Sequence, residues 1–150
     1  MAKILVVDDE RVVRDLVRAV LVGEGHEVGE ARDGLEALEV VEQNGLPDII
    51  VLDLMMPQMD GWRFLEELRS RGLRRHTRVI ILSALSDEDT RKRGTAEGAQ
   101  HVLSKPFDTD ALIDAVSDAL AQPAEDIAAS RERVDELAEM LRTIDEALTN

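Results

Sequence analysis

Short apolar runs that end in polar side chains constrain the fold of this chain most strongly. Three of them, over residues 4–7, 49–52 and 79–82, are rich in branched aliphatic side chains, and a longer helical stretch follows each one. Weaker strand patterns cover 27–31 and 101–104. The alternation predicts five strands, each followed by a helix. Strands joined by helical crossovers must be parallel, so we expect a doubly wound α/β fold.

The composition supports a sheet that is covered on both faces. Hydrophobic residues make up 44% of the 150 residues, but the aromatic share is 2%, with one Trp, two Phe and no Tyr. The core must therefore consist of aliphatic side chains, which suit parallel sheets buried between helices. The predicted helices cover residues 12–21, 35–41, 61–71, 87–97 and 108–120.

Charge and hydropathy exclude several classes of partner. The formal charge of −14 argues against nonspecific binding to nucleic acid, so we expect no direct nucleic-acid contact. The absence of cysteine excludes disulfides and thiolate metal sites. The run at 4–7 is too short for a signal peptide, and no run approaches membrane-spanning length. We expect a cytoplasmic protein that does not engage a membrane.

Chemically versatile side chains follow four of the five predicted strands. They are Asp8, Asp9, Asp53, Ser83 and Lys105. Ligands of parallel sheets bind outside the carboxyl ends of the strands, so these side chains are expected to meet at one edge. Acids beside a lysine and a hydroxyl suit a hard cation such as Mg²⁺. A carboxylate can also attack phosphorus and form an acyl phosphate, with the cation, lysine and hydroxyl neutralising the transferring oxygens.

Each of these residues also has a simpler interpretation. Asp8 or Asp9 could cap the next helix, and Ser83 could be an ordinary strand-end hydroxyl. Lys105 could be a surface lysine before Pro106, which is expected to set a rigid turn with either a trans or a cis bond. The convergence of all of them at one edge favours a functional site over these separate explanations.

Four motifs, in this order along the chain, resemble those of a known family. They are Val6-Val7-Asp8-Asp9, Leu52-Asp53-Leu54-Met55-Met56-Pro57-Gln58-Met59-Asp60-Gly61, Leu82-Ser83-Ala84 and Lys105-Pro106-Phe107. Over roughly residues 3–121 the chain resembles the response-regulator receiver domain (CheY-like) of two-component phosphorelay systems. The resemblance implies a flavodoxin-like, five-stranded parallel sheet of order 2-1-3-4-5 with helices on both faces.

The same resemblance implies that the chain is phosphorylated. Asp53 would accept a phosphoryl group from the phosphohistidine of a sensor histidine kinase or a phosphotransfer protein. Lys105 would pair with the phosphoryl oxygens, while Ser83 would hydrogen-bond to the phosphate and move inward on activation. The family is not expected to act as an enzyme beyond its own phosphorylation and dephosphorylation.

The resemblance further implies that Mg²⁺ is the cofactor. Asp9, Asp53 and the backbone carbonyl of Met55 would bind the ion directly. Asp8 would assist through a water molecule. The sequence therefore predicts a magnesium site and a phosphorylation site that share the Asp53 carboxylate.

Three positions depart from the family pattern. Val102 stands where many receivers have Tyr or Phe, so the rotation of a ring cannot accompany the movement of Ser83. Met55 and Leu85 occupy the positions that border the path of hydrolytic water, and their apolar side chains cannot orient water by hydrogen bonds. We therefore predict slow self-dephosphorylation.

A cluster of basic residues interrupts the acidic chain. It comprises Arg69, Arg71, Arg74, Arg75, His76 and Arg78. The cluster could dock an acidic partner or nucleic acid. We favour a solvated loop whose arginines balance nearby acids.

Residues 122–150 exceed what the predicted receiver domain, 1–121, requires. Residues recur there every seven positions in two series, Ile127, Val134, Leu141 and Leu148, and then Ser130, Leu137 and Ile144, and all of them are apolar except Ser130. This heptad pattern favours a helical tail that forms a parallel coiled-coil homodimer or a signalling helix, rather than one that packs onto its own domain. A downstream output domain, where one is used, would lie outside this sequence.

Two other functions compete with a phosphorylated switch. A phosphorylation-independent scaffold or adaptor, acting through the helical tail, gains slight support from Val102 but is opposed by the complete set of strand-end residues. A hydrolase of the haloacid-dehalogenase kind also uses a strand-end aspartate. It requires a second aspartate two residues later, where this chain has Met55. The sequence therefore predicts a receiver that relays its signal by a change of conformation or dimerisation.

Overall fold

A single parallel sheet forms the centre of the protein. The computed structural model describes residues 2–73, 77–84, 87–122 and 137–147. The strands of the sheet are β1 (Lys3–Val7), β2 (Glu27–Ala31), β3 (Ile49–Asp53), β4 (Arg78–Ser83) and β5 (His101–Ser104). Their order is β2-β1-β3-β4-β5, and every neighbouring pair is parallel. The predicted fold class and strand order are confirmed.

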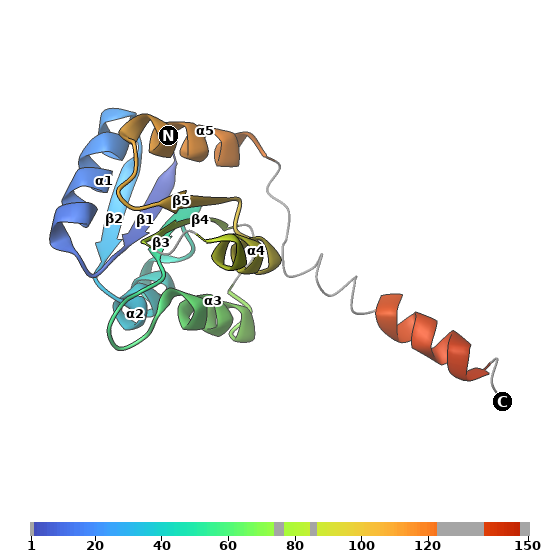
Figure 1. Ribbon diagram of the computed structural model, residues 1–150. Helices are drawn as coiled ribbons and strands as arrows, with labels where there is room; N and C mark the ends of the chain where they lie inside the picture. The colour runs from blue at the N-terminus through green and yellow to red at the C-terminus, as the bar shows by residue number, and fades with distance from the viewer. Residues whose placement is uncertain (1, 74–76, 85–86, 123–136, 148–150) are drawn as a thin grey trace.

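Helices cover both faces of this sheet. They are α1 (Arg11–Gly23), α2 (Gly34–Asn44), α3 (Gly61–Ser70), α4 (Glu88–Ala96) and α5 (Thr109–Ala121). Figure 1 shows α1 and α5 together on one face, and α2 and α3 on the other, with α4 beside β5. This placement follows from right-handed crossovers between parallel strands.

The central strand, β3, has buried side chains along its whole length. Ile50 and Leu52 face a core that α2 and α3 complete, whereas Ile49 and Val51 face the core beneath α1 and α5. Burial on both faces explains why the sequence of this strand is continuously apolar rather than alternating.

Aspartates define where four of the helices begin. Asp33, Asp60, Asp87 and Asp108 each accept a hydrogen bond from a backbone N–H of the first turn of α2, α3, α4 and α5, respectively. Such caps satisfy donors that have no partner within the helix. Helix α1 differs, because its N-cap residue, Glu10, makes no side-chain capping bond.

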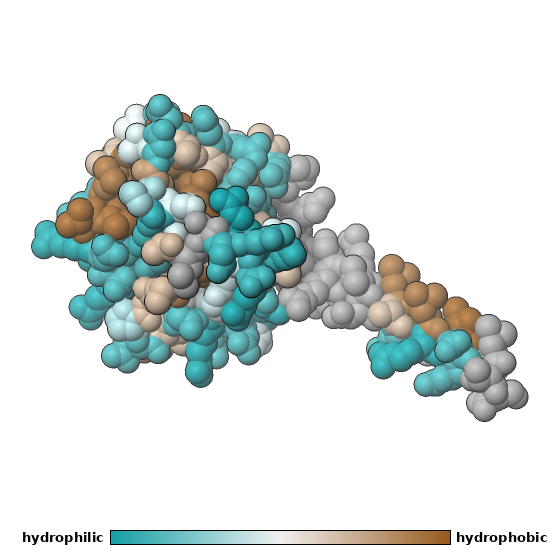
Figure 2. All heavy atoms as spheres, viewed as in Figure 1, coloured by the Kyte–Doolittle hydropathy of each residue, from teal (hydrophilic) through white to brown (hydrophobic). Residues whose placement is uncertain are grey.

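The apolar residues of α1 are divided between core and solvent. Val17 and Leu21 are fully buried against the sheet and α5. Val12 and Leu16 share the helical spacing but are 79% and 44% exposed. The buried face is therefore narrower than the apolar pattern of the sequence, and Figure 2 shows apolar side chains gathered over α1 at the left of the molecule.

A helix in the C-terminal tail is confirmed over residues 137–147, where every residue is exposed. Its large apolar side chains are Leu137, Met140, Leu141 and Ile144. Figure 2 shows apolar atoms along one side of this helix and polar atoms along the other. The other predicted heptad positions, Ile127, Ser130, Val134 and Leu148, lie outside the described residues. Among the described residues, no helix is long and apolar enough to cross a membrane.

Candidate functional site: an acidic pocket at the carboxyl edge of the sheet

Strand register brings the predicted site residues to one edge of the sheet. Val7 of β1 pairs with Leu52 of β3, so Asp8 and Asp53 follow at the same level. On the other side of β3, Asp53 pairs with Leu82, which places Ser83 one residue beyond it on β4. Ser83 in turn pairs with Ser104 of β5, the residue before Lys105. Parallel pairing thus converts residues far apart in sequence into neighbours.

Lys105 lies between acids from β1 and β3. Its Nζ atom is 2.7 Å from Oδ2 of Asp8 and 3.5 Å from Oδ2 of Asp53. Oε1 of Glu10 lies 3.7 Å from the same Nζ atom. The Lys105–Pro106 bond is cis, one of the two forms left open by the sequence. The ammonium therefore neutralises carboxylates from two different strands.

Asp53 is 4% exposed, and the N–H of Met55 donates a long hydrogen bond of 3.4 Å to its Oδ1 atom. Burial, followed by the nearby charge of Asp8, raises the pKa of Asp53 to about 6, although Lys105 acts in the opposite direction. Asp53 is consequently ionised at neutral pH, but its charge is poorly solvated because the side chain is buried.

The partners of Asp53 are perturbed by the same surroundings. Burial raises the pKa of Asp8, against the lowering effects of Lys105 and of the hydrogen bond from the Glu10 N–H. Burial disfavours the charged form of Lys105, but the hydrogen bond to Asp8 and the charges of Asp53, Asp8 and Glu10 raise its pKa overall. An ammonium held between acids stays charged throughout the physiological range.

Carboxylates gather beside this lysine in a way that fits a hard cation. One oxygen each from Asp8, Asp9 and Glu10 lies within 4.8 Å of the others, with Asp8 buried and the other two exposed. The two buried acids, Asp8 and Asp53, share the single ammonium of Lys105, so a divalent cation would relieve their repulsion. Oxygen donors of this kind are those that Mg²⁺ prefers. Sequence reasoning did not include Glu10, although it directly follows Asp8 and Asp9.

The loop after Asp53 forms an open groove next to the acids. Its volume is about 440 Å³, and its lining residues are Asp9, Leu54, Met55, Met56, Pro57, Asp60, Trp62 and Thr90. Met55 is 60% exposed there, and Arg93 of α4 stacks over the Trp62 ring at 4.3 Å. The groove therefore opens beside the exposed acid Asp9.

Gly61 allows α3 to begin close behind Asp53. A Cβ atom at this position would lie 2.5 Å from the backbone oxygen of Asp53 and 2.9 Å from Cα of Leu54. The Gly61 N–H also donates to the Leu54 carbonyl at 3.0 Å. The glycine that ends the second motif therefore has a steric role, which spacing alone did not reveal.

The remaining predicted residues have diverse surroundings. Ser83 is fully buried at the end of β4. Val102 packs under α4, where its Cγ2 would lie 2.9 Å from a Cβ built on Gly94. Leu85, named for the dephosphorylation rate, lies outside the described residues.

Arginines of the predicted basic cluster are paired where the structure describes them. Arg69 forms an ion pair with Glu97, and Arg71 forms ion pairs with Glu42 and Glu67. Arg78 donates to the backbone carbonyl of Gln122 at 2.7 Å. The ion pairs of Arg69 and Arg71 support the interpretation of arginines balanced by nearby acids, whereas the Nε atom of Arg78 is buried without a hydrogen-bond partner. Arg74, Arg75 and His76 lie outside the described residues.

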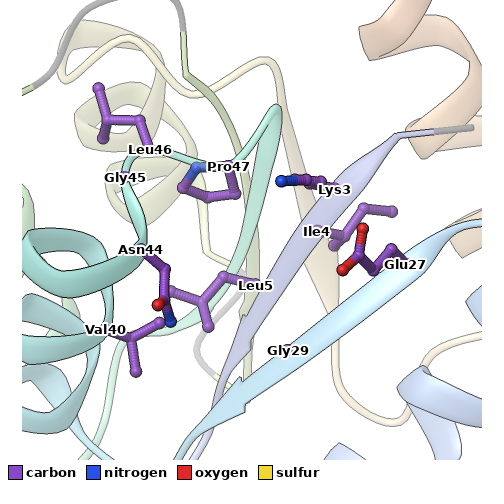
Figure 3. A pocket seen from close by; sticks show the side chains of 10 residues that line it. All are labelled: Lys3, Ile4, Leu5, Glu27, Gly29, Val40, Asn44, Gly45, Leu46 and Pro47. Atoms are coloured by element: carbon purple, nitrogen blue, oxygen red, sulfur yellow. The ribbon is translucent and has the colours of Figure 1, made fainter.

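A second hollow, of about 490 Å³, lies at the opposite, amino edge of the sheet between β2 and α2 (Figure 3). Lys3 and Glu27, which are paired in the strand register, supply its charged side chains. None of the predicted site residues lines it. The predicted site residues that the structure describes lie instead at the carboxyl edge.

Comparison with known proteins agrees with this geometry. The response regulator receiver domain family matches residues 4–117. The chain is 40% identical over 111 residues to the response regulator MprA of Mycobacterium sp. (strain KMS), covering 74% of this chain and 47% of MprA. It is 42% identical over 107 residues to the response regulator PleD of Caulobacter vibrioides (strain NA1000 / CB15N), covering 71% of this chain and 23% of PleD.

Solved structures show the same fold. The receiver domain of the Francisella response regulator 1452 matches with a TM-score of 0.73 at 36% identity, covering 79% of this chain and 96% of that one. The chemotaxis protein CheY4 of Vibrio cholerae also gives a TM-score of 0.73, at 33% identity, covering 79% of this chain and 98% of that one. The chain thus spans less than half of the matched MprA and nearly all of the matched receiver structures. This protein belongs to the response regulator receiver domain family of two-component systems.

Proposed function

We propose that Asp53 accepts a phosphoryl group from a phosphohistidine on a sensor kinase or a phosphotransfer protein. The observation that carries this proposal is the buried arrangement of Asp53 and Asp8 around Lys105 at the open edge of the sheet. A carboxylate oxygen of Asp53 would attack phosphorus as the bond from phosphorus to the imidazole nitrogen breaks. The electron pair stays with the imidazole, and an acyl phosphate remains on Asp53.

Lys105 would stabilise the charge that develops during this transfer. Receiver domains generally bind Mg²⁺ at an acidic pocket. In this chain we assign the ion to Asp9, Asp53 and the Met55 carbonyl, with Asp8 acting through water. When bound, Mg²⁺ would neutralise the phosphoryl oxygens that face the acids, while Lys105 would pair with another of them. Ser83 would supply a hydrogen bond after transfer.

Receiver domains interact with histidine kinases or phosphotransfer proteins. The exposed side chains of Val12 and Leu16, on the helix that follows the acidic loop, support docking of such a macromolecular donor next to Asp53. Met55 adds apolar surface on the other side of the acids. Buried apolar contact would give the donor affinity, and the acidic pocket would determine which group is transferred.

Signal output is assigned to the tail. We divide the chain into a receiver domain at 1–121 and a helical tail at 122–150 that forms a parallel coiled-coil homodimer or signalling helix. The exposed stripe of Leu137, Leu141 and Ile144 supports this division, because those residues fall on the two heptad series. We propose no enzymatic activity beyond phosphorylation and dephosphorylation of the chain itself.

Incubation with Mg²⁺ and a small phosphodonor, followed by intact mass measurement, tests the proposal. The natural sequence should gain an adduct of about 80 Da that Asp53→Asn does not gain. The exposed thioether of Met55 supports slow loss of that adduct. Absence of the adduct from the natural sequence would contradict the proposed phosphorylation.

The second candidate is a phosphorylation-independent scaffold or adaptor acting through the tail. The aliphatic packing of Val102 under α4 favours it, because no ring is present there to follow the state of Ser83. Sedimentation of the protein with and without phosphorylation separates the two functions. A tail-mediated dimer whose affinity is unchanged on phosphorylation would favour the scaffold.

A further inference from the structure

Helix α1 begins directly after the acidic loop and lacks the aspartate cap that α2, α3, α4 and α5 each have. Its N-cap residue, Glu10, makes no side-chain capping bond, and its first turn contains no acidic residue. The loop that precedes it, Asp8–Glu10, nevertheless holds carboxylates within 4.8 Å of one another. Like charges at this distance repel, so cationic groups must help to hold the loop, and Lys105 already pairs with Asp8 and Glu10.

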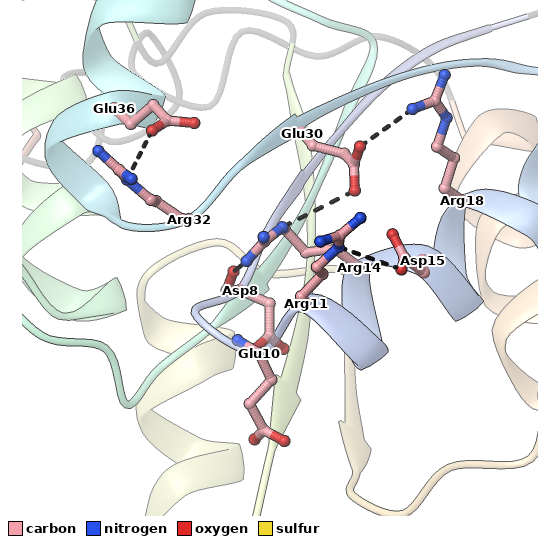
Figure 4. Close-up of polar contacts among 9 residues, drawn as sticks. All are labelled: Asp8, Glu10, Arg11, Arg14, Asp15, Arg18, Glu30, Arg32 and Glu36. Carbon is pink, nitrogen blue, oxygen red and sulfur yellow. Dashed lines mark hydrogen bonds and ion pairs between the residues drawn. The ribbon is translucent and has the colours of Figure 1, made fainter.

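Arg14, in the first turns of α1, is bonded directly to that loop. Its Nη1 atom donates a hydrogen bond of 2.7 Å to the backbone carbonyl of Asp8. Its Nε atom lies 3.8 Å from Oε1 of Glu30 on β2. The Arg14 side chain is 17% exposed, which is low for an arginine on a helix at the surface. Figure 4 shows it reaching from α1 to both partners.

Glu30, the ion-pair partner of Arg14, lies within the strand β2. It pairs in register with Val6 of β1, two residues before Asp8. Its Oε2 atom also accepts a hydrogen bond of 3.1 Å from Nη1 of Arg18. The guanidinium of Arg14 therefore connects α1, the acidic loop and the edge strand.

With the bond from Arg14, the backbone N–H, the carboxylate and the backbone carbonyl of Asp8 each make a hydrogen bond. Its N–H donates to the Ala31 carbonyl at 3.1 Å, and its Oδ1 accepts from the Glu10 N–H at 2.9 Å. The carbonyl bonded by Arg14 belongs to the peptide that leads into Asp9. Because a peptide is planar, the direction of that carbonyl determines how the Asp9 residue leaves the strand.

We infer that Arg14, anchored by Glu30, is a positioning residue that sets the loop of acids for the cation. This inference rests on the proposed Mg²⁺-dependent phosphorylation. The bond of Arg14 to the acidic loop goes to the backbone carbonyl of Asp8 rather than to a carboxylate of Asp8, Asp9 or Glu10, so Arg14 acts through the Asp8–Asp9 peptide. Its removal should weaken Mg²⁺ binding, while the phosphorylation rate at saturating Mg²⁺ should stay close to that of the natural sequence.

Arg18 provides a matched control for a simple ion pair. It contacts the same carboxylate from the same helix, but its side chain is 54% exposed, and its hydrogen bond goes to Glu30 rather than to the loop. Exposed ion pairs contribute little to stability. Arg14→Gln and Arg18→Gln therefore remove the same charge from neighbouring turns of α1, and Arg14→Gln alone releases the Asp8 carbonyl.

The test measures Mg²⁺ affinity of the whole chain by calorimetry, and by the fluorescence of Trp62, which lines the groove with Asp9. Arg14→Gln should bind Mg²⁺ about tenfold more weakly, as is typical when a group that orients a metal ligand is removed. Arg18→Gln should remain within about twofold of the natural sequence. The Mg²⁺ affinity of Arg14→Lys should lie between those of the two Gln variants. An ammonium can bond to either the Asp8 carbonyl or Glu30, but it cannot bond to both as the forked guanidinium does.

A second readout does not involve the metal. In the presence of chelator, amide hydrogen exchange at residues 8–10 should be faster in Arg14→Gln than in Arg18→Gln. If Arg14→Gln does not fold, Glu30→Gln takes its place and should bind Mg²⁺ several-fold more weakly than Arg18→Gln.

Equal Mg²⁺ affinities of Arg14→Gln and Arg18→Gln would overturn this inference but not the proposed function. Where Glu30→Gln replaces Arg14→Gln, equal affinities of Glu30→Gln and Arg18→Gln would have the same meaning. The natural sequence would still bind the ion and be phosphorylated in that case. Failure of the natural sequence to bind Mg²⁺ would overturn the proposed function, and this inference with it.

Discussion

At the scale of single residues, the electrostatics of the site depend on Lys105 and its two buried partners, Asp8 and Asp53. Asp8 and Asp53 are both buried and both lie within 3.5 Å of the same Nζ atom. One ammonium cannot fully compensate two carboxylates that have lost their water. The repulsion between these two carboxylates is therefore unfavourable to folding, and a bound cation would reduce it.

We predict that Asp53→Asn stabilises the metal-free protein at neutral pH. The folded-state pKa of Asp53 is raised from 3.8 to about 6, so the folded protein holds this proton more tightly than the unfolded chain does. Ionised Asp53 thus lowers the free energy of unfolding above pH 6, and the penalty fades as the pH falls toward 4. The expected gain at pH 7.5 is about 1–3 kcal/mol, measured by urea unfolding with chelator.

The exposed Asp114→Asn serves as the control for this substitution. A gain for Asp53→Asn that persists unchanged at pH 4 would contradict the electrostatic explanation. Mg²⁺ should stabilise the natural sequence more than it stabilises Asp53→Asn.

A second prediction concerns Lys105→Met. Loss of the ammonium removes a partner of the transferring oxygens, so phosphorylation should slow roughly a hundredfold at saturating Mg²⁺. The measurement is a time course of intact mass. Lys92→Met is the matched control, because Lys92 lies on the surface of α4 and pairs with Glu88. Equal rates in the two variants would exclude a role for Lys105 in the transfer.

At the scale of elements, the loop between β3 and α3 sets the space around Asp53. Gly61 lets the first turn of α3 contact the backbone of Asp53 and Leu54, and Asp60 caps the same turn by accepting from the Arg63 N–H at 2.8 Å. A helix that starts this close to the end of a strand must carry glycine at the contact. The position of the acidic groove therefore depends on a backbone contact between two elements.

Gly61→Ala should lower the free energy of unfolding by about 1–3 kcal/mol, because the added methyl group meets backbone atoms that cannot move aside. Urea unfolding measures this change. Gly23→Ala is the matched control, since a Cβ atom at this position would meet no heavy atom within 4 Å outside its own stretch of helix. We expect Gly23→Ala to be neutral or stabilising by a few tenths of a kcal/mol. Equal effects at the two positions would contradict the steric argument.

At the scale of the whole molecule, two exposed apolar surfaces accompany the acidic residues at the carboxyl edge of the sheet. Among the described residues, large exposed apolar side chains form two groups, one of Val12 and Leu16 on α1 and one along the helix at 137–147, while Val22, Leu35 and Met55 are exposed singly. Isolated exposed side chains are common in monomers, but a stripe along a helix indicates a packing partner. We assign the first surface to the phosphodonor and the second to another copy of the chain.

We predict that the full chain forms a dimer that residues 1–121 do not form. Leu141→Asp should shift the full chain toward monomer, because it places a charge in the apolar seam. Light scattering with size exclusion measures the molecular mass. Thr143→Asp adds the same charge at a neighbouring position outside the two heptad series, and it should leave the mass unchanged. A full chain that is monomeric at high concentration would contradict a tail-mediated dimer.

The sequence by itself was sufficient for the fold class, the strand order implied by the family, and the identity of the strand-end residues. The fold class and the strand-end residues are local or follow from connectivity, through apolar runs, helical spacing and the polar residue that ends a strand, whereas the strand order came from the family resemblance. The cap of α2 by Asp33 and that of α4 by Asp87 are equally local. Each cap involves an aspartate and a backbone N–H no more than three residues further along the chain.

Only the tertiary structure decided which acids contact the Lys105 ammonium and which residues hold those acids in place. The approach of Glu10 to Lys105, the bond from Arg14 to the Asp8 carbonyl and the exposure of Val12 depend on strand register and helix orientation. Register is fixed by burial of the whole sheet, and helix orientation by packing between helices that are distant in sequence. A linear pattern can therefore name the acids of this site, but the packing of β1, β2, β3 and α1 determines how they face one another.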